Sequence, residues 1–257
     1  KDMYRSLEEI CKEAAATGCS FWELIQKDDC RERQIAQEES FVQLQRMYQA
    51  MKEADQDYDE TLHSRSGLVG TDGGKLEHYV EQEEPICGDF LGRVMEKAVK
   101  MGESNACMKR IVAAPTAGSC GVIPAVFLSY EEYCKETENR MVEALFVSAG
   151  IGAVIAENAS IAGASGGCQA EIGSASAMAA GGLAYLQGGD AECIANAAAF
   201  ALKNMLGLTC DPVCGLVEVP CIKRNSAGAV NAAVSAQMAM AGIKSAIPAD
   251  EGGGSMR

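Results

Sequence analysis

Aromatic, basic and proline residues are scarce in this sequence. Aromatic side chains make up 5% of the 257 residues and include a single Trp, which argues against a surface that stacks nucleobases. The 22 Lys and Arg are outnumbered by 36 Asp and Glu, so the formal charge is −14. This acidic balance argues against nucleic acid and anionic membranes as partners. Only 6 Pro stand beside 27 Gly, so the positions of the glycines need an explanation.

Long apolar runs and a secretory leader are not apparent either. The N-terminal residues are charged, unlike a signal peptide. Residues 111–130 and 225–243 are uncharged, but prolines interrupt the first and the second contains neither Leu nor Phe. Both are too weakly apolar to insert into a bilayer, and we expect buried helices there. The sequence therefore predicts a cytoplasmic protein without membrane segments.

Cysteine, in contrast, is abundant. The chain has 12 Cys, yet a secreted disulfide scaffold is shorter and richer in loops. We therefore expect reduced thiols, some of them metal ligands.

The first third of the chain has helical periodicity. Ser6 with Glu9 and Ser20 with Glu23 have the spacing of capping boxes, each ahead of an apolar stripe. A third helix is indicated by apolar residues at Phe41, Leu44, Met47 and Met51. Four glycines interrupt this pattern in residues 64–75, for which we predict a loop, and residues 89–103 are expected to be helical again.

Later helices have a different composition. The runs 140–158, 171–187, 190–206 and 226–242 consist largely of Ala, Gly, Ser and Met, which let helix axes approach closely. They are too long and too poor in β-branched and aromatic residues for strands. The predicted fold is all-α, a compact helical bundle with Gly-rich and Cys-bearing loops forming the active site. We expect one catalytic domain over residues 1–257, with a helical layer (1–62), a substrate loop (63–75) and a helical core (76–257).

Three segments look unlike packing helices. Residues 113–121 place small residues just before a predicted helix, where exposed N–H groups suit a carboxylate or phosphate, although an ordinary tight turn is an equal reading. Residues 163–171 place Cys168 directly after two glycines, and residues 207–225 contain Cys210, Cys214 and Cys221 with prolines between them.

Thiolates on irregular segments can converge on a metal. Zinc sites usually use paired Cys motifs, and Cys210 with Cys214 forms a single C-x3-C here. Cys168, Cys210 and Cys221 instead have a spacing that suits a [4Fe-4S] cluster with one iron left open as a Lewis acid. Buried free thiols remain an alternative on spacing alone.

Several long segments resemble one known family. SRSGLVGTDGGKL, APTAGSCGVIPAVF, GASGGCQAEIGSASAMAAGGL and GLTCDPVCGLVEVPCIKRN are similar, in this order, to the signature segments of iron–sulfur-dependent L-serine dehydratases. The resemblance extends from about residue 4 to about 250, the catalytic α region of that family. It implies an α subunit of the two-subunit type, with a separate β subunit, assembled as an oligomer.

The resemblance also implies functional residues. Cys168, Cys210 and Cys221 match the cluster ligands, whereas Cys214 is expected to be a buried thiol without this role. The residues that match the family's two substrate-binding loops are Ser64, Ser66, Gly67, Thr71, Asp72 and Lys75, followed by Thr116, Ala117 and Gly118.

The implied reaction converts L-serine to pyruvate and ammonia, as a lyase of L-serine degradation that is oxygen-sensitive and can feed gluconeogenesis. An open iron would assist departure of hydroxide while a base removes the α-proton, and His63, Lys75 and Glu171 are the candidate bases. Glu171 is equally suited to bracing the cluster segment, and His63 to being a solvated surface residue. We expect no pyridoxal phosphate, because no convincing Schiff-base Lys with a phosphate cup is present.

Other functions remain open at this point. A related lyase acting on L-cysteine or L-threonine would use the same iron. A redox or sensor iron–sulfur protein would need a fourth thiolate ligand, for which Cys214 is the candidate. Some single-chain relatives block the open iron with a cysteine from the C-terminal tail, and this sequence has no cysteine after Cys221.

Overall fold

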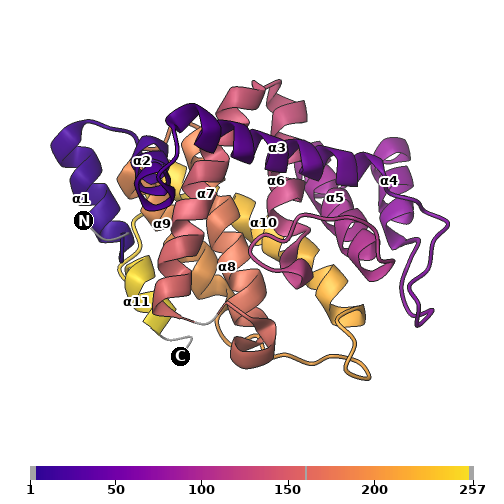
Figure 1. Ribbon diagram of the computed structural model, residues 1–257. Helices are drawn as coiled ribbons and strands as arrows, with labels where there is room; N and C mark the ends of the chain where they lie inside the picture. Colours follow the sequence, from indigo (N-terminus) through magenta and orange to yellow (C-terminus); the bar gives the residue numbers. More distant parts are fainter. Residues whose placement is uncertain (1–3, 160, 255–257) are drawn as a thin grey trace.

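The computed structural model is an assembly of α-helices (Figure 1) and describes residues 4–159 and 161–254. Over these ranges it contains no β-strand, only an isolated bridge between Val213 and Leu216. The prediction of an all-α fold is confirmed. The helices are α1 (Leu7–Thr17), α2 (Phe21–Arg33), α3 (Gln37–Gln56), α4 (Asp72–Gln82), α5 (Gly88–Ala106), α6 (Val122–Cys134), α7 (Glu138–Asn158), α8 (Gly163–Leu186), α9 (Ala191–Met205), α10 (Val219–Met240) and α11 (Ala249–Gly254), with a 3₁₀ turn η1 at Ala117–Ser119.

The predicted start signals of the first two helices hold in different degrees. At α2 the Glu23 carboxylate accepts hydrogen bonds from the N–H and the hydroxyl of Ser20, at 2.8 and 2.9 Å. At α1 the N–H of Glu9 donates to the Ser6 hydroxyl, but the Glu9 carboxylate accepts from the N–H of Arg5 and not of Ser6. Both helices begin where the sequence predicts.

The core is built from the small-residue helices α7 to α10. A Cβ added at Gly181 in α8 would lie 2.1 Å from Cδ1 of Ile151 in α7, so these two helices pack at a distance that favours Gly. Four alanines of α9, Ala197, Ala198, Ala199 and Ala201, are buried and help to fill the same interior. The expected close approach of these helices is confirmed.

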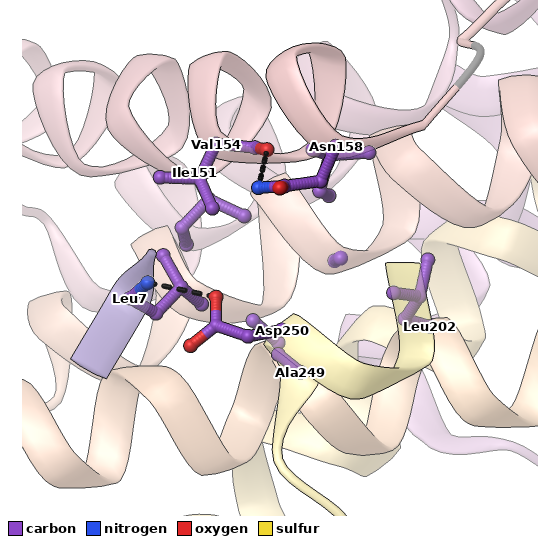
Figure 2. A pocket seen from close by; sticks show the side chains of 10 residues that line it. Leu7, Ile151, Val154, Asn158, Leu202, Ala249 and Asp250 are labelled. Carbon is purple, nitrogen blue, oxygen red and sulfur yellow. Dashed lines mark hydrogen bonds between the residues drawn. The ribbon is translucent and has the colours of Figure 1, made fainter. Parts of the chain in front are cut away.

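The N-terminal helices cover this core. Figure 1 shows α3 running across α7 and α6 toward α5, with α1 and α11 together at the opposite end. Figure 2 shows how the last two are joined: Asp250 of α11 accepts the N–H of Leu7 at 2.8 Å, which places a carboxylate at the N-terminus of α1. The cavity around this contact holds only about 10 Å³, so it suits no ligand larger than water.

One helix in the described part of the chain, α7, is apolar and long enough to cross a membrane by composition. In its most apolar window 67% of the residues are buried inside the structure, which is typical of a core helix. The runs 111–130 and 225–243 do not pass this test.

Three predicted segment boundaries are wrong. The loop expected at residues 64–75 ends at Thr71, because Asp72–Lys75 form the first turn of α4. The segment 163–171 is the beginning of α8 and not a loop. In the segment 207–225 the chain is irregular only up to Glu218, and Cys221 lies in the first turn of α10 after Pro220. Several predicted site residues thus lie at helix ends.

Candidate functional site

The three segments singled out in the sequence meet around the N-terminal end of α10. Figure 1 shows the irregular segment that precedes α10 (orange) passing below the start of α8. The η1 turn contacts both α8 and α10. The loop before α4 reaches the same end of α10 through Ser64 and Ser66, which contact Glu218.

Cys168 is positioned by a break in α8. Gly167 has φ 76° and ψ −178°, and a Cβ there would lie 2.9 Å from the carbonyl oxygen of Leu208. The N–H of Gln169 donates to that same carbonyl at 3.0 Å. The backbone of α8 and the segment 207–218 are therefore in direct contact on both sides of Cys168, which is itself buried.

Arg224 joins the two cysteine-bearing segments from α10. Its guanidinium lies 3.1 Å from the sulfur of Cys168 and donates at 3.3 Å to the carbonyl of Thr209. It also makes a two-pronged ion pair with the carboxylate of Asp211. One cation thus holds the neighbours of Cys210 beside Cys168.

The two buried thiols among the predicted ligands, Cys168 and Cys221, have raised pKa values. Burial raises the pKa of Cys168, while Arg224 opposes this rise. Burial raises the pKa of Cys221 to about 11, and Cys168, Glu171 and Cys210 add to it. Three soft sulfur donors therefore share one region, which fits an iron–sulfur group by donor type. Within the described residues no group of three or more His, Cys, Asp or Glu side chains is arranged closely enough to hold a metal ion, so the fit is one of donor type and not of geometry.

The expected burial of Cys214 is wrong. Cys214 is exposed and has a left-handed backbone with φ 52°, in the short turn closed by the bridge between Val213 and Leu216. Cys210 on the same segment is exposed as well, whereas Cys168 and Cys221 are buried. The turn chemistry of residues 213–216 is the physical reason, since it turns this segment away from the core.

The η1 turn is tied to α8 and α10. The Thr116 hydroxyl donates to the Glu171 carboxylate, and a Cβ at Gly118 would lie 2.6 Å from the same oxygen, Oε1. Asn225 is buried, accepts the N–H of Gly121 at 2.9 Å and donates to the carbonyl of Gly118 at 2.8 Å. Predicted site residues Thr116 and Gly118 therefore lie next to Glu171, and Ala117 is exposed between them.

The loop before α4 is fixed at both ends. The hydroxyls of Ser64 and Ser66 donate to Oε2 of Glu218 at 2.8 and 2.6 Å. At the other end Asp72 forms ion pairs with Lys75 and Lys223, and these cations lower the pKa of its carboxyl. The remaining predicted residues, Gly67 and Thr71, have positive φ angles of 75° and 72°.

The candidate bases differ in their surroundings. His63 is exposed. Lys75 is exposed too, and its pKa is raised because Asp72 stabilises the charged ammonium, which is the opposite of what a general base needs. Glu171 is half-buried, hydrogen-bonded to Thr116, and close enough to Cys221 to act on the pKa of its thiol. Among the three, Glu171 is the group that lies with the predicted ligands.

Sequence reasoning missed Glu218, Arg224 and Asn225. Each acts through a contact with a residue distant in the chain, such as the 154 positions between Ser64 and Glu218. A signal did exist: the polar cluster KRN, residues 223–225, interrupts a helix of small apolar residues two positions after Cys221.

The chain is similar to known proteins of one family over nearly its whole length. A family model described as serine dehydratase alpha chain matches residues 16–257. The probable L-serine dehydratase alpha chain of Bacillus subtilis (strain 168) is 42% identical over 249 residues, which cover 97% of this chain and 83% of that protein. The L-serine dehydratase alpha chain of Peptoniphilus asaccharolyticus is 37% identical over 248 residues, 96% of this chain and 84% of that one. L-serine dehydratase TdcG of Escherichia coli (strain K12) is 49% identical over 144 residues, covering 56% of this chain and 32% of that protein.

Proposed function

The chain belongs to the serine dehydratase alpha-chain family, and from this premise we propose that it is the α chain of an iron–sulfur-dependent L-serine dehydratase. The reaction is that of a lyase, L-serine ammonia-lyase, and it degrades L-serine to pyruvate and ammonia. The proposal includes a separate β chain, an oligomeric assembly and a cytoplasmic location.

Cys168, Cys210 and Cys221 would hold a [4Fe-4S] cluster, as three thiolate donors from α8, the segment before α10, and α10 itself. When bound, such a group supplies a Lewis-acidic iron that assists the departure of the substrate hydroxyl. The positive charge of Arg224, 3.1 Å from the sulfur of Cys168, would compensate part of the negative charge of the thiolates.

The chain's own residues would bind the substrate and move its proton. Ser64 and Ser66 offer hydroxyls at one side of the site, and the η1 turn with Thr116, Ala117 and Gly118 frames another. Glu171 would accept the α-proton, because it combines a carboxylate with a place beside the predicted ligands. Loss of the α-proton and of hydroxide leaves aminoacrylate, which tautomerises to the imine and takes up water to give pyruvate and ammonia.

The observation that supports this proposal best is that Arg224, three residues after Cys221, lies 3.1 Å from the sulfur of Cys168 and donates at 3.3 Å to the carbonyl of Thr209, the residue before Cys210. The test is anaerobic reconstitution with iron and sulfide, followed by an assay of the 2-oxo-acid product, which is pyruvate from L-serine or L-cysteine and 2-oxobutanoate from L-threonine. Fast formation of pyruvate from L-serine is expected. A metal-free anaerobic preparation that deaminates L-serine would contradict the cluster.

Single substitutions separate the ligands from the remaining thiols. Cys168→Ala, Cys210→Ala and Cys221→Ala are each expected to lower iron content and to abolish turnover. Cys214→Ala, a matched change on the same exposed segment as Cys210, should leave both close to wild type. Loss of iron in Cys214→Ala alone would assign the ligands differently.

A further inference from the structure

Glu218 is a buried acidic residue at the point where the loop before α4 meets helix α10. It is the residue directly before α10, and 9% of its surface is exposed. Its oxygen Oε2 accepts the hydroxyls of Ser64 at 2.8 Å and Ser66 at 2.6 Å. The described residues provide no hydrogen bond to its other oxygen, Oε1, and this oxygen is not fully enclosed by the protein, so a ligand can reach it.

No cation within the described chain neutralises this carboxylate. The two bases of the first turns of α10 are already paired, Lys223 with Asp72 and Arg224 with Asp211. No ion pair within 4.0 Å joins Glu218 to a Lys, Arg or His of the described residues. A carboxylate that is largely buried without a cation has lost part of its hydration, which favours a cationic group from outside the chain at this position.

Other buried acids of the protein show the usual solutions. Glu96 forms ion pairs with Arg93 and Lys100. Glu103 accepts the N–H groups of Asp72 and Gly73 at the N-terminus of α4 and the hydroxyl of Tyr58. Glu218 has neither a cation nor backbone donors, which sets it apart from these structural carboxylates.

The numbers of hydrogen-bond donors and acceptors in this cluster favour a ligand with N–H donors. A Ser hydroxyl has a single proton, and Ser64 and Ser66 direct theirs to Glu218. Their oxygens, which lie 3.0 Å apart, then have only lone pairs left to offer. Together with Oε1 the cluster is a set of acceptors with one negative charge, and a primary ammonium with three protons is its complement.

We propose that Ser64, Ser66 and Glu218 form the subsite that binds the α-ammonium group of the amino-acid substrate. The inference rests on the proposed function, since it places the substrate beside Cys221, three residues after Glu218. It makes α-amino acids the substrate class and disfavours hydroxy acids that lack the ammonium. Glu218 then determines specificity by charge, and Ser64 and Ser66 orient the substrate.

The test compares two unreactive ligands on the anaerobically purified enzyme with its partner chain. L-Alanine has the ammonium, whereas 3-hydroxypropanoate has the carboxylate and the β-hydroxyl but no ammonium. In Glu218→Gln the Kd of L-alanine, measured by calorimetry, should rise about 10- to 100-fold, as expected for loss of a charged hydrogen bond. The Kd of 3-hydroxypropanoate should stay unchanged or fall, because a buried negative charge near its carboxylate is removed.

A second variant covers the case in which Glu218→Gln does not fold. Ser66→Ala removes one hydroxyl at an exposed residue and keeps the charge of Glu218. The Kd of L-alanine should therefore rise, but by less than in Glu218→Gln. The assignment is overturned if the Kd values of both ligands rise equally, or if the Kd of L-alanine does not rise. A change confined to the dependence of activity on K⁺ also overturns it, because the subsite would then belong to a metal cation.

The outcome is separable from that of the proposed function. If the wild-type enzyme forms pyruvate from L-serine but Glu218→Gln changes the Kd of L-alanine no more than that of 3-hydroxypropanoate, only the ammonium subsite is rejected. Wild-type enzyme that binds L-alanine through Glu218 but forms no pyruvate from L-serine rejects the proposed function and leaves the ammonium subsite in place.

Discussion

The guanidinium of Arg224 lies 3.1 Å from the sulfur of Cys168, although the two residues are 56 positions apart in the chain. The same side chain binds the carbonyl of Thr209 and the carboxylate of Asp211, on both sides of Cys210. Arg224 therefore connects the two segments that contain Cys168 and Cys210.

Replacing Arg224 with Gln should loosen the segment 207–218 and weaken cluster assembly. The variant loses the charged contacts to Asp211 and Cys168. One charged hydrogen bond contributes about 1.5–3 kcal/mol when it is buried, and less at this partly exposed site. We expect faster proteolysis within residues 207–218 and less iron per chain after reconstitution, read by limited proteolysis and metal analysis. Lys223→Gln is the matched control on the neighbouring position, and equal effects of both substitutions would contradict the role of Arg224.

Gly118 is constrained by Glu171. A Cβ at this position would lie 2.6 and 2.7 Å from the two carboxylate oxygens of Glu171. Gly118→Ala should therefore push the carboxylate aside, with a loss of about 1–3 kcal/mol in the free energy of unfolding and a large loss of turnover. Chemical denaturation and the pyruvate assay measure the two effects.

Gly173→Ala provides the control for this substitution. It lies in α8 as Glu171 does, and its added Cβ would meet the Cβ of Met205 at 3.3 Å, a contact that a small shift relieves. Helix propensity favours Ala there by roughly 0.5–1 kcal/mol, so stability should change little or increase. A Gly118→Ala enzyme as active as Gly173→Ala would show that Glu171 has no role in proton transfer.

Two cysteines at one cavity should differ strongly in reactivity. Cys11 and Cys19 both line a cavity of about 590 Å³ between α1, α2 and α9. Hydrogen bonds from Thr17 and Lys27 lower the pKa of Cys19, and the Lys27 ammonium lies 3.1 Å from its sulfur. Burial raises the pKa of Cys11 to about 11. Because the thiolate is the nucleophile, iodoacetamide near neutral pH should label Cys19 at least about ten times faster than Cys11.

Peptide mass spectrometry of the labelled protein gives both rates in one experiment. Lys27→Gln should slow the labelling of Cys19 and leave Cys11 unchanged, since Cys11 does not contact Lys27. If Cys11 is labelled first, or if Lys27→Gln changes neither rate, the electrostatic account of this pair fails.

The helices could be predicted from the sequence because their causes are local. The start of α2 follows from Ser20 and Glu23, three residues apart, and the close packing of α8 follows from its small residues. The loop expected up to residue 75 ended earlier for a non-local reason. Glu103 of α5 accepts the N–H groups of Asp72 and Gly73, which stabilises a helical turn that two glycines would otherwise disfavour.

The sequence indicates which segments form the candidate site, but it does not indicate which residues contact one another there. The cysteines and the serine loop have recognisable local patterns. Glu218 and Asn225 look like ordinary polar residues, and their roles appear only when α10 is placed against the loop before α4 and the η1 turn. The exposure of Cys214 depends on the turn at residues 213–216 and could not be derived from composition.

The cap of α2 should make stability depend on pH in the acidic range. The N–H and hydroxyl of Ser20 lower the pKa of Glu23 below its ordinary value of 4.5, so the folded state binds this proton less readily than the unfolded state. The stabilisation is present above the ordinary pKa and is lost as the pH falls through the lower, folded pKa. Glu23→Gln should therefore destabilise the protein by about 0.5 kcal/mol near neutral pH, since the side chain is only partly buried and solvent weakens the interaction. Urea unfolding of both proteins from neutral pH to about pH 3 measures the difference, which should vanish at the acidic end. A constant difference over this range would mean that Glu23 stabilises α2 by packing alone.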